Sequence, residues 1–150
     1  MERVGTSSRF LFSVEGPQLL RIGNRVGTVL PAHTSSGGRA ALALHSESAV
    51  AQLYQGRATQ RAGGTLGAQE LTRLQGELVR VPERGYALDI GLIEPDLFAI
   101  GAAVGQLNRP RLLALSLSAP ISLAEALQRP AAIASLLEAC LSIRGELNGE

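Results

Sequence analysis

Residues 21–43 have the sequence RIGNRVGTVLPAHTSSGGRAALA, and the organisation of the chain follows from this stretch. It predicts the end of an extended segment, a loop, a turn of small residues and an apolar helix from about Ser36 to Leu44. Hydroxyl side chains cap helix N-termini because their oxygens accept hydrogen bonds from the unpaired amides of the first turn. Glycine lets another group approach the backbone, and unpaired amides attract anions. The stretch is therefore either a plain helix cap or a cradle for a small acid.

The composition of the chain limits its class. It has 150 residues, 45% of them hydrophobic, which suits one domain with one core. The formal net charge is +1, all 14 basic residues are arginine, and no basic run occurs, so a nucleic-acid surface is not expected. A single cysteine cannot form an internal disulfide, and no apolar run approaches the roughly 20 residues of a membrane span. We expect a cytoplasmic protein without membrane association.

Several segments before residue 85 have a clear periodicity or turn composition. Apolar residues bounded by turn residues favour strands, and apolar residues at i, i+3 and i+4 favour amphipathic helices. A polar, glycine-rich run favours a mobile surface loop. The expected elements are strands at 10–14 and 18–22, a loop or short strand at 26–30, a short helix capped by Ser46, a mobile loop at 55–66 and a helix at 70–81 that Pro82 ends.

The C-terminal part predicts strands followed by helices. The segment 98–104 has little polar content, which indicates a central strand. Alternation in 112–118 places Ser116 and Ser118 on one face and Leu115 and Leu117 on the other. The other expected elements are a strand at 87–90, a hairpin turn at 108–110, a helix at 123–128 capped by Ser122, and a final helix to about Leu147 with the stripe Ile133, Leu136, Leu137, Cys140, Leu141 and Arg144. This pattern predicts an α+β or α/β sandwich with a mostly antiparallel sheet.

Three segments in this order resemble one protein family. They are RIGNRVGTVLPAHTSSGGRA at 21–40, VRVPERGYALD at 79–89, and FAIGAAV at 98–104 followed by ALSLSAP at 114–120. The set resembles the effector-binding domain of IclR-type bacterial transcriptional regulators over nearly the whole chain. The resemblance implies a GAF/PAS-like curved, mostly antiparallel sheet flanked by helices, which binds a small metabolite, often a carboxylate, and forms homodimers or tetramers. It implies no enzymatic activity, no cofactor and no metal.

The sequence departs from the family pattern in three ways. The winged helix-turn-helix that contacts DNA in this family is expected to be absent. Met1 aligns near the family's second strand, so the domain's first helix and strand are also expected to be absent, which leaves a strand edge uncovered. The family often has an acidic run after the position of Asp89 and a cysteine at the position of Ala99, whereas this chain has Ile90, Gly91 and alanine. We therefore expect a less polar pocket.

The resemblance also implies which residues form that pocket. Backbone amides and hydroxyls hold a carboxylate through charge-assisted hydrogen bonds, and an apolar wall buries the rest of a small ligand. Transferred position by position, the pocket comprises Ser36 and Gly37 at the helix start, Asp89 on the opposite strand, Ala99 at the cysteine position, Ser116 and Ser118 on the last strand, and an apolar wall of Leu19 and Ile22.

Structural explanations compete with each assignment. The hydroxyl and glycine residues at the helix start would also be expected if they only cap the helix. Asp89 could instead stabilise a turn or form a salt bridge at the surface. The alternative function is an oligomerisation module without a ligand, in which Phe98 or Leu115 fills the space beside Ser36. A hydrolase acting through His33 is a third hypothesis, which the lack of a G-x-S-x-G motif disfavours.

Overall fold

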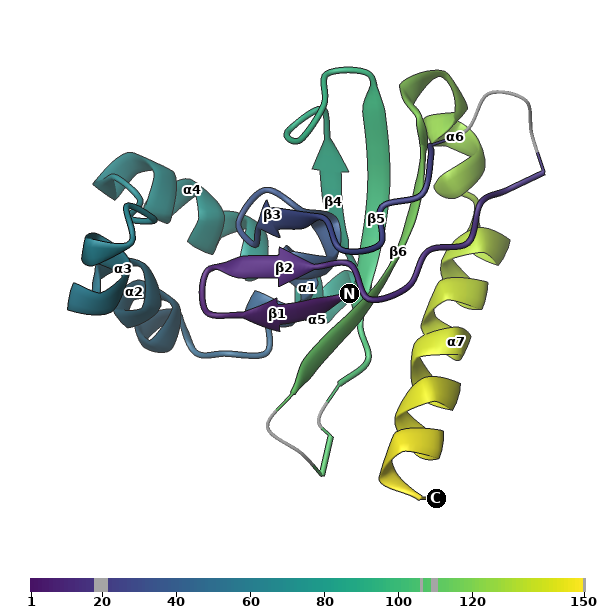
Figure 1. Cartoon of the computed structure of the whole chain (residues 1–150). Helices are drawn as coiled ribbons and strands as arrows, with labels where there is room; N and C mark the ends of the chain where they lie inside the picture. Colours follow the sequence, from purple (N-terminus) through teal and green to yellow (C-terminus); the bar gives the residue numbers. More distant parts are fainter. Residues whose placement is uncertain (18–21, 106, 109–110, 150) are drawn as a thin grey trace.

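The computed structural model describes residues 1–17, 22–105, 107–108 and 111–149, which form a curled antiparallel sheet with flanking helices (Figure 1). The sheet of these residues has six strands in the order β3-β2-β1-β6-β5-β4. Three strands are short and lie near the N-terminus: β1 (Glu2–Val4), β2 (Ser7–Arg9) and β3 (Val29–Pro31). The other three are β4 (Ala87–Ile90), β5 (Leu97–Ala103) and β6 (Leu112–Pro120). This arrangement confirms the predicted α+β fold with an antiparallel, curved sheet.

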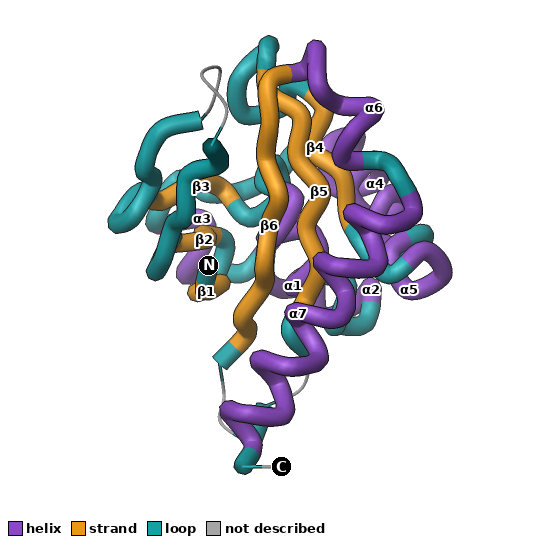
Figure 2. Tube along the Cα trace, turned by 90° about the vertical axis from the view of Figure 1, so that its right-hand side faces the viewer, coloured by secondary structure: helices purple, strands orange, loops and turns teal. Residues whose placement is uncertain are grey.

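The two faces of strands β4 to β6 are covered by different helices. In Figure 2, α7 (Pro130–Asn148) passes in front of these strands, and α1 (Ser36–Leu42) lies behind them. Because alternate residues of a strand point to opposite faces, β5 contributes to both layers. The core under α7 contains Phe98, Ile100, Ala102, Val104, Leu136 and Cys140. On the other face, Ala40 of α1 packs with Val81 and Ala87.

Four further helices follow α1 in the chain, and two of them, α2 and α4, form a third core with it. The four helices are α2 (Glu47–Gln55), α3 (Arg57–Arg61), α4 (Ala68–Leu78) and α5 (Val81–Arg84). This core includes Leu42 of α1, Tyr54 of α2, and Leu71, Leu74 and Leu78 of α4. The predicted cap at Ser46 is confirmed, since its hydroxyl accepts a hydrogen bond from the Ala49 amide at 3.2 Å. Among the described residues, none of the helices combines the length and the apolar character needed to cross a membrane.

Several local predictions were wrong. Residues 10–14 lie in no strand, although Phe10 makes backbone hydrogen bonds to Gly27 and Thr28. Strands β1 and β2 were not predicted, because three-residue strands rich in polar side chains show no periodicity. The expected loop at 55–66 contains α3, whose five residues have no buried side chain to mark a helix.

The C-terminal predictions need two corrections. Ser122 caps no helix, because it lies inside the 3-10 helix Ile121–Leu123 that precedes α6 (Ala124–Leu127). Leu141 is 54% exposed, so it does not belong to the buried stripe of α7, whereas Ile143 does pack against that core. Residues 18–21 and 109–110, parts of an expected strand and turn, lie outside the described residues.

Candidate functional site

The start of α1 is a capped helix end that packs tightly against the sheet. Ser35 is the N-cap, and its hydroxyl accepts a hydrogen bond from the Gly38 amide at 3.2 Å. The next hydroxyl, that of Ser36, donates to the Ser116 hydroxyl on β6, also at 3.2 Å. A Cβ added to Gly101 would overlap the backbone of Ser36 and Gly37, so only glycine permits this approach. The helix start is therefore held directly over strands β5 and β6.

Strand register brings most of the predicted pocket residues onto the face that α1 covers. Asp89 is paired with Ala99, and Ala99 with Ser118. Gly101 is paired with Ser116 two residues further along. Residues that are directly opposite in antiparallel strands project to the same side of the sheet. Asp89, Ala99, Ser116 and Ser118 thus share one face.

Asp89 is engaged by its own turn. Its side chain is 1% exposed, and Oδ1 accepts a hydrogen bond from the Leu92 amide at 2.9 Å. Burial raises the pKa of this carboxyl, while the Leu92 and Ile93 amides and the charge of Arg39 act in the opposite direction. These contacts stabilise the connection between β4 and β5, so Asp89 has the role of a turn residue, which is the alternative to a role in ligand binding.

Arg39 is a structural residue that the sequence patterns did not indicate. Its Nε donates to the carbonyl of His33 at 2.6 Å, and Nη1 donates to the carbonyl of Leu88 at 3.2 Å. Burial lowers its pKa, and the nearby carboxylates of Glu77 and Asp89 raise it. Arg39 therefore ties the loop before α1 to β4. The sequence feature that could have indicated this role is the position of Arg39, a charged residue inside an otherwise apolar helix.

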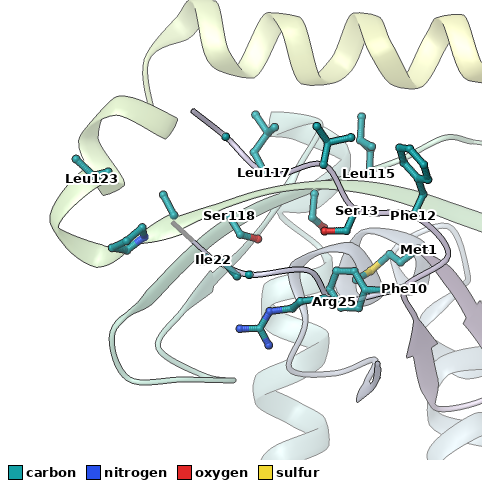
Figure 3. Close-up of a pocket in the computed structure, with 16 residues that line it drawn as sticks. Met1, Phe10, Phe12, Ser13, Ile22, Arg25, Leu115, Leu117, Ser118 and Leu123 are labelled. Carbon is teal, nitrogen blue, oxygen red and sulfur yellow. The ribbon is translucent and has the colours of Figure 1, made fainter. Parts of the chain in front are cut away.

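A cavity of about 300 Å³ lies beside β6, and no residue of α1 is among its described lining residues (Figure 3). Strand β1 pairs with β6 at Leu112 and Leu113, and Met1 continues this pairing to Ala114, so within the described part of the chain the cavity follows the section of β6 that begins at Leu115. Its other wall is the N-terminal segment between β2 and β3. The lining residues are Met1, Phe10, Phe12, Ser13, Val14, Gly16, Ile22, Gly23, Arg25, Leu115, Ser116, Leu117, Ser118, Ala119, Pro120 and Leu123.

The cavity contains some of the predicted pocket residues and not others. Ser116, Ser118 and Ile22 line it. Leu19 lies outside the described residues. The remaining predictions, namely Ser36, Gly37, Asp89 and Ala99, are not among the lining residues, and their role in binding stays a prediction.

The side chain of Met1 lies between the N-terminus of α1 and the cavity. A Cβ on Gly37 would collide with Met1 Sδ and would lie 2.8 Å from Ser116 Oγ. Met1 also lines the cavity, and its carbonyl accepts a hydrogen bond from the Ala114 amide at 2.9 Å. Neither residue expected to fill this place does so, because Phe98 and Leu115 pack in the core beneath α7.

Arg25 supplies the positive charge of the cavity. It is the charged residue among the described lining residues, and its side chain is 23% exposed. Its Nη2 lies 2.6 Å from Oε1 of Glu94, which follows β4. In Figure 3, Arg25 lies on the same side of β6 as Ser118 and Ile22. Sequence analysis missed Arg25 because an isolated arginine in a loop has no periodic or motif signal.

The remaining reactive side chains are located in packed surroundings. Cys140 is buried, its pKa is raised by burial, and its Sγ lies 3.6 Å from the Ala102 carbonyl, which confirms it as a core residue. The His33 ring packs edge-on against Tyr54 at 5.7 Å between centroids. In the part of the chain that the structure describes, no three His, Cys, Asp or Glu side chains are grouped so that they could hold a metal ion.

One family model matches most of the chain, and solved structures of transcriptional regulators share its fold. Residues 2–144 match the family described as bacterial transcriptional regulator IclR C-terminal. The crystal structure of transcriptional regulator YaiJ is similar with a TM-score of 0.80 and 21% identity, over 99% of this chain and 83% of that chain. The IclR transcriptional regulator of Alicyclobacillus acidocaldarius is similar with a TM-score of 0.73 and 24% identity, over 96% of this chain and 58% of that one. No curated protein matches the chain.

Proposed function

The chain belongs to the family of C-terminal domains of IclR-type bacterial transcriptional regulators, and from this premise we propose that it senses a small organic acid in the cavity beside β6. Family membership is carried by the match over residues 2–144. The ligand class is our proposal. It rests on one observation: a cavity of about 300 Å³ whose described lining is mainly apolar but contains the hydroxyls of three serines and the guanidinium of Arg25.

This lining suits an acid with an apolar body. Pockets for small ligands are mostly apolar and contain a few polar groups that fix the orientation of the ligand. The hydroxyls of Ser13, Ser116 and Ser118 are hydrogen-bond donors, and Arg25 is a cation. A carboxylate removed from water requires such partners, since an unpaired buried charge is costly. The apolar side chains on both walls would bury the remainder of the molecule.

In a regulator, such binding would be transmitted to a DNA-contacting segment. The net charge of +1 and the absence of a basic run in the sequence support a DNA contact made elsewhere, through the winged helix-turn-helix of this family. Assembly into a homodimer or tetramer likewise stays a prediction from the family resemblance.

Thermal denaturation with a panel of carboxylic acids tests the proposal. A ligand that binds only the folded state should raise the melting temperature by about 5–10 °C at 100 times its Kd. Benzoate, phenylacetate, isovalerate and pyruvate form the panel, and benzamide is the neutral control. We expect at least one acid to stabilise the protein and benzamide to have little effect.

Two serine variants locate the binding site. Ser118→Ala removes a lining hydroxyl while leaving the Ser36–Ser116 hydrogen bond intact, and Ser116→Ala with Ser118→Ala removes both. The shift caused by the acid should decrease in the single variant and more so in the double variant. An unchanged shift in the double variant would place the acid outside this cavity.

The position of Met1 favours a second candidate, an oligomerisation module without a ligand. Its side chain fills the space over Gly37, where a ligand would otherwise reach the amides of α1. This candidate predicts that no acid in the panel changes the melting temperature, while analytical ultracentrifugation shows a stable oligomer. Stabilisation by an acid, lost in the serine variants, would exclude it.

A further inference from the structure

We propose that Arg25 binds the carboxylate of the effector, and that Glu94 is an internal anion that occupies Arg25 until the acid arrives. This inference rests on the proposed function of the cavity. It adds the residue that recognises the acid, the residue that competes with it, and the chemical class of the ligand.

The backbone of Arg25 is held rigidly beside the cavity. The carbonyl of Arg25 accepts a hydrogen bond from the Thr28 amide at 2.9 Å, which closes a turn. Gly27 adopts a positive φ of 84° in this turn and donates to the carbonyl of Phe10 at 2.9 Å. Phe10 in turn donates to the carbonyl of Thr28 at 3.0 Å. The guanidinium therefore starts from a fixed point, which reduces the entropy lost when it binds a ligand.

Among the described residues, Arg25 has the charged side chain that lines the cavity and can pair with an acid there. Arg39, which lies near the predicted site, donates to the carbonyls of His33 and Leu88 and does not line the cavity. The serine hydroxyls are neutral donors, whereas hydrogen bonds between a guanidinium and a carboxylate are roughly twice as strong as those between neutral groups. A planar guanidinium also matches a carboxylate in a two-point contact.

Glu94 is suited to leave Arg25 when another carboxylate binds. Its side chain is 52% exposed and that of Arg25 is 23% exposed, so Glu94 can return to water while the arginine stays in place. An ion pair with one exposed partner contributes only about 0–1 kcal/mol. The recorded contact is made by one nitrogen, Nη2, at 2.6 Å. A ligand carboxylate that contacts two guanidinium nitrogens and also buries apolar surface would therefore compete successfully.

The cavity walls define the body of the acid. Phe10 and Ile22 lie on the N-terminal wall, and Leu117, Pro120 and Leu123 lie on the opposite side. Burial of apolar ligand surface is worth about 25 cal/mol per Å². A monocarboxylate with a branched or aromatic body would cover this surface, and a small acid such as pyruvate would leave much of it in contact with water. We infer that the ligand is an amphipathic monocarboxylate.

Exchange of the anion at Arg25 would also affect a neighbouring turn. Glu94 belongs to the connection between β4 and β5, which the hydrogen bond from the Leu92 amide to buried Asp89 stabilises. The Arg25–Glu94 contact joins residues 69 positions apart in the sequence. Its release would separate this turn from the N-terminal segment.

Two substitutions with opposite expected effects test the inference. Binding of benzoate and isovalerate is measured by isothermal titration calorimetry, with benzamide as the neutral analogue. Arg25→Met should weaken the binding of each acid by about tenfold or more, because a charged hydrogen-bond partner is lost. Glu94→Gln should tighten it by about two- to fivefold, because the internal competitor is removed. Benzamide binding should change little in either variant.

Matched controls use a distant ion pair. Arg80 and Glu77 lie 3.5 Å apart, and neither lines the cavity. Arg80→Met and Glu77→Gln should leave acid binding unchanged. If Arg25→Met does not fold, Glu94→Gln still tests the inference. Tighter acid binding in this variant would support competition by Glu94, whereas an ion pair with a purely structural role predicts weaker acid binding.

The possible failures can be told apart. Weaker binding in Glu94→Gln would show that the pair supports the cavity and is not a competitor, and it would overturn the inference. Equal acid binding by the wild type, Arg25→Met and Glu94→Gln would also overturn it while leaving the sensing function intact. If no acid binds the wild type, the proposed function itself fails and the inference fails with it.

Discussion

Glycine residues at the contact between α1 and the sheet show how single positions control this fold. A Cβ at Gly101 would overlap the Ser36 carbonyl carbon and the Gly37 nitrogen, which are backbone atoms and cannot rotate away. Gly38 is equally enclosed, by the Ala32 backbone and the Ser35 hydroxyl. The sequence predicted a close approach at the glycines of residues 37–38, but not at Gly101, and it did not indicate which group approaches. The structure shows that β5 approaches the backbone of Ser36 and Gly37 through Gly101, while the loop before α1 encloses Gly38.

Gly101→Ala should therefore be strongly destabilising. We expect the free energy of unfolding to fall by about 2–3 kcal/mol or more, because overpacking against backbone forces α1 away from the sheet. Urea denaturation monitored by circular dichroism measures this change.

Gly76→Ala is the matched control. Gly76 lies inside α4, and a Cβ there would meet no atom within 4 Å. Alanine is the better helix former, so this variant should gain about 0.5–1 kcal/mol. Equal effects of the two substitutions would contradict the close packing of α1 on β5.

Among the elements, α7 shows where periodicity succeeds and where it fails. The helix was predicted, and its positions Leu136 and Cys140 are buried against β5 and β6 as expected. Leu141 was assigned to the same stripe but is 54% exposed. An apolar residue at the edge of a stripe is buried only if a neighbouring element reaches it, and spacing along the helix carries no information about that neighbour.

Leu136→Ala and Leu141→Ala separate the buried face of α7 from its exposed face. Leu136 is 1% exposed, and its truncation should lower the free energy of unfolding by about 2–5 kcal/mol through lost burial and a residual cavity. Leu141→Ala should change it by no more than about 0.5 kcal/mol. Guanidinium denaturation gives both values, and a large loss in Leu141→Ala would indicate that this face is covered in solution.

At the scale of the whole molecule, the two histidines make stability depend on pH. Burial lowers the pKa of His33 from its ordinary 6.5, and the charge of Arg39 lowers it further while Glu70 raises it. Burial and the charge of Arg3 lower the pKa of His45. Just below pH 6.5, the two histidines of the unfolded chain therefore bind protons that they do not bind in the folded chain. Stability is complete above that pH and is lost as the pH falls toward the folded-state pKa values.

We expect the melting temperature to fall between pH 7.5 and pH 5. His33→Asn with His45→Asn should flatten this dependence, which differential scanning calorimetry at several pH values would show. Asp89 has the opposite sign, since its raised pKa means that the folded state gains a proton more readily than the unfolded state as the solution is acidified. An unchanged slope in the double variant would mean that other groups control the pH dependence.

The sequence by itself determined the family, the antiparallel α+β architecture and the shared face of Ser116 and Ser118. The family followed from the resemblance of three ordered segments, and the architecture and the shared face followed from side-chain spacing and turn composition, which are local properties of the chain. Only the tertiary structure decided where a cavity lies and what surrounds it. Arg25 meets Glu94 across 69 positions, and Met1 covers Gly37, through contacts that no local pattern encodes. The physical reason is that a cavity is the space left between packed segments, so its position depends on how those segments fit together.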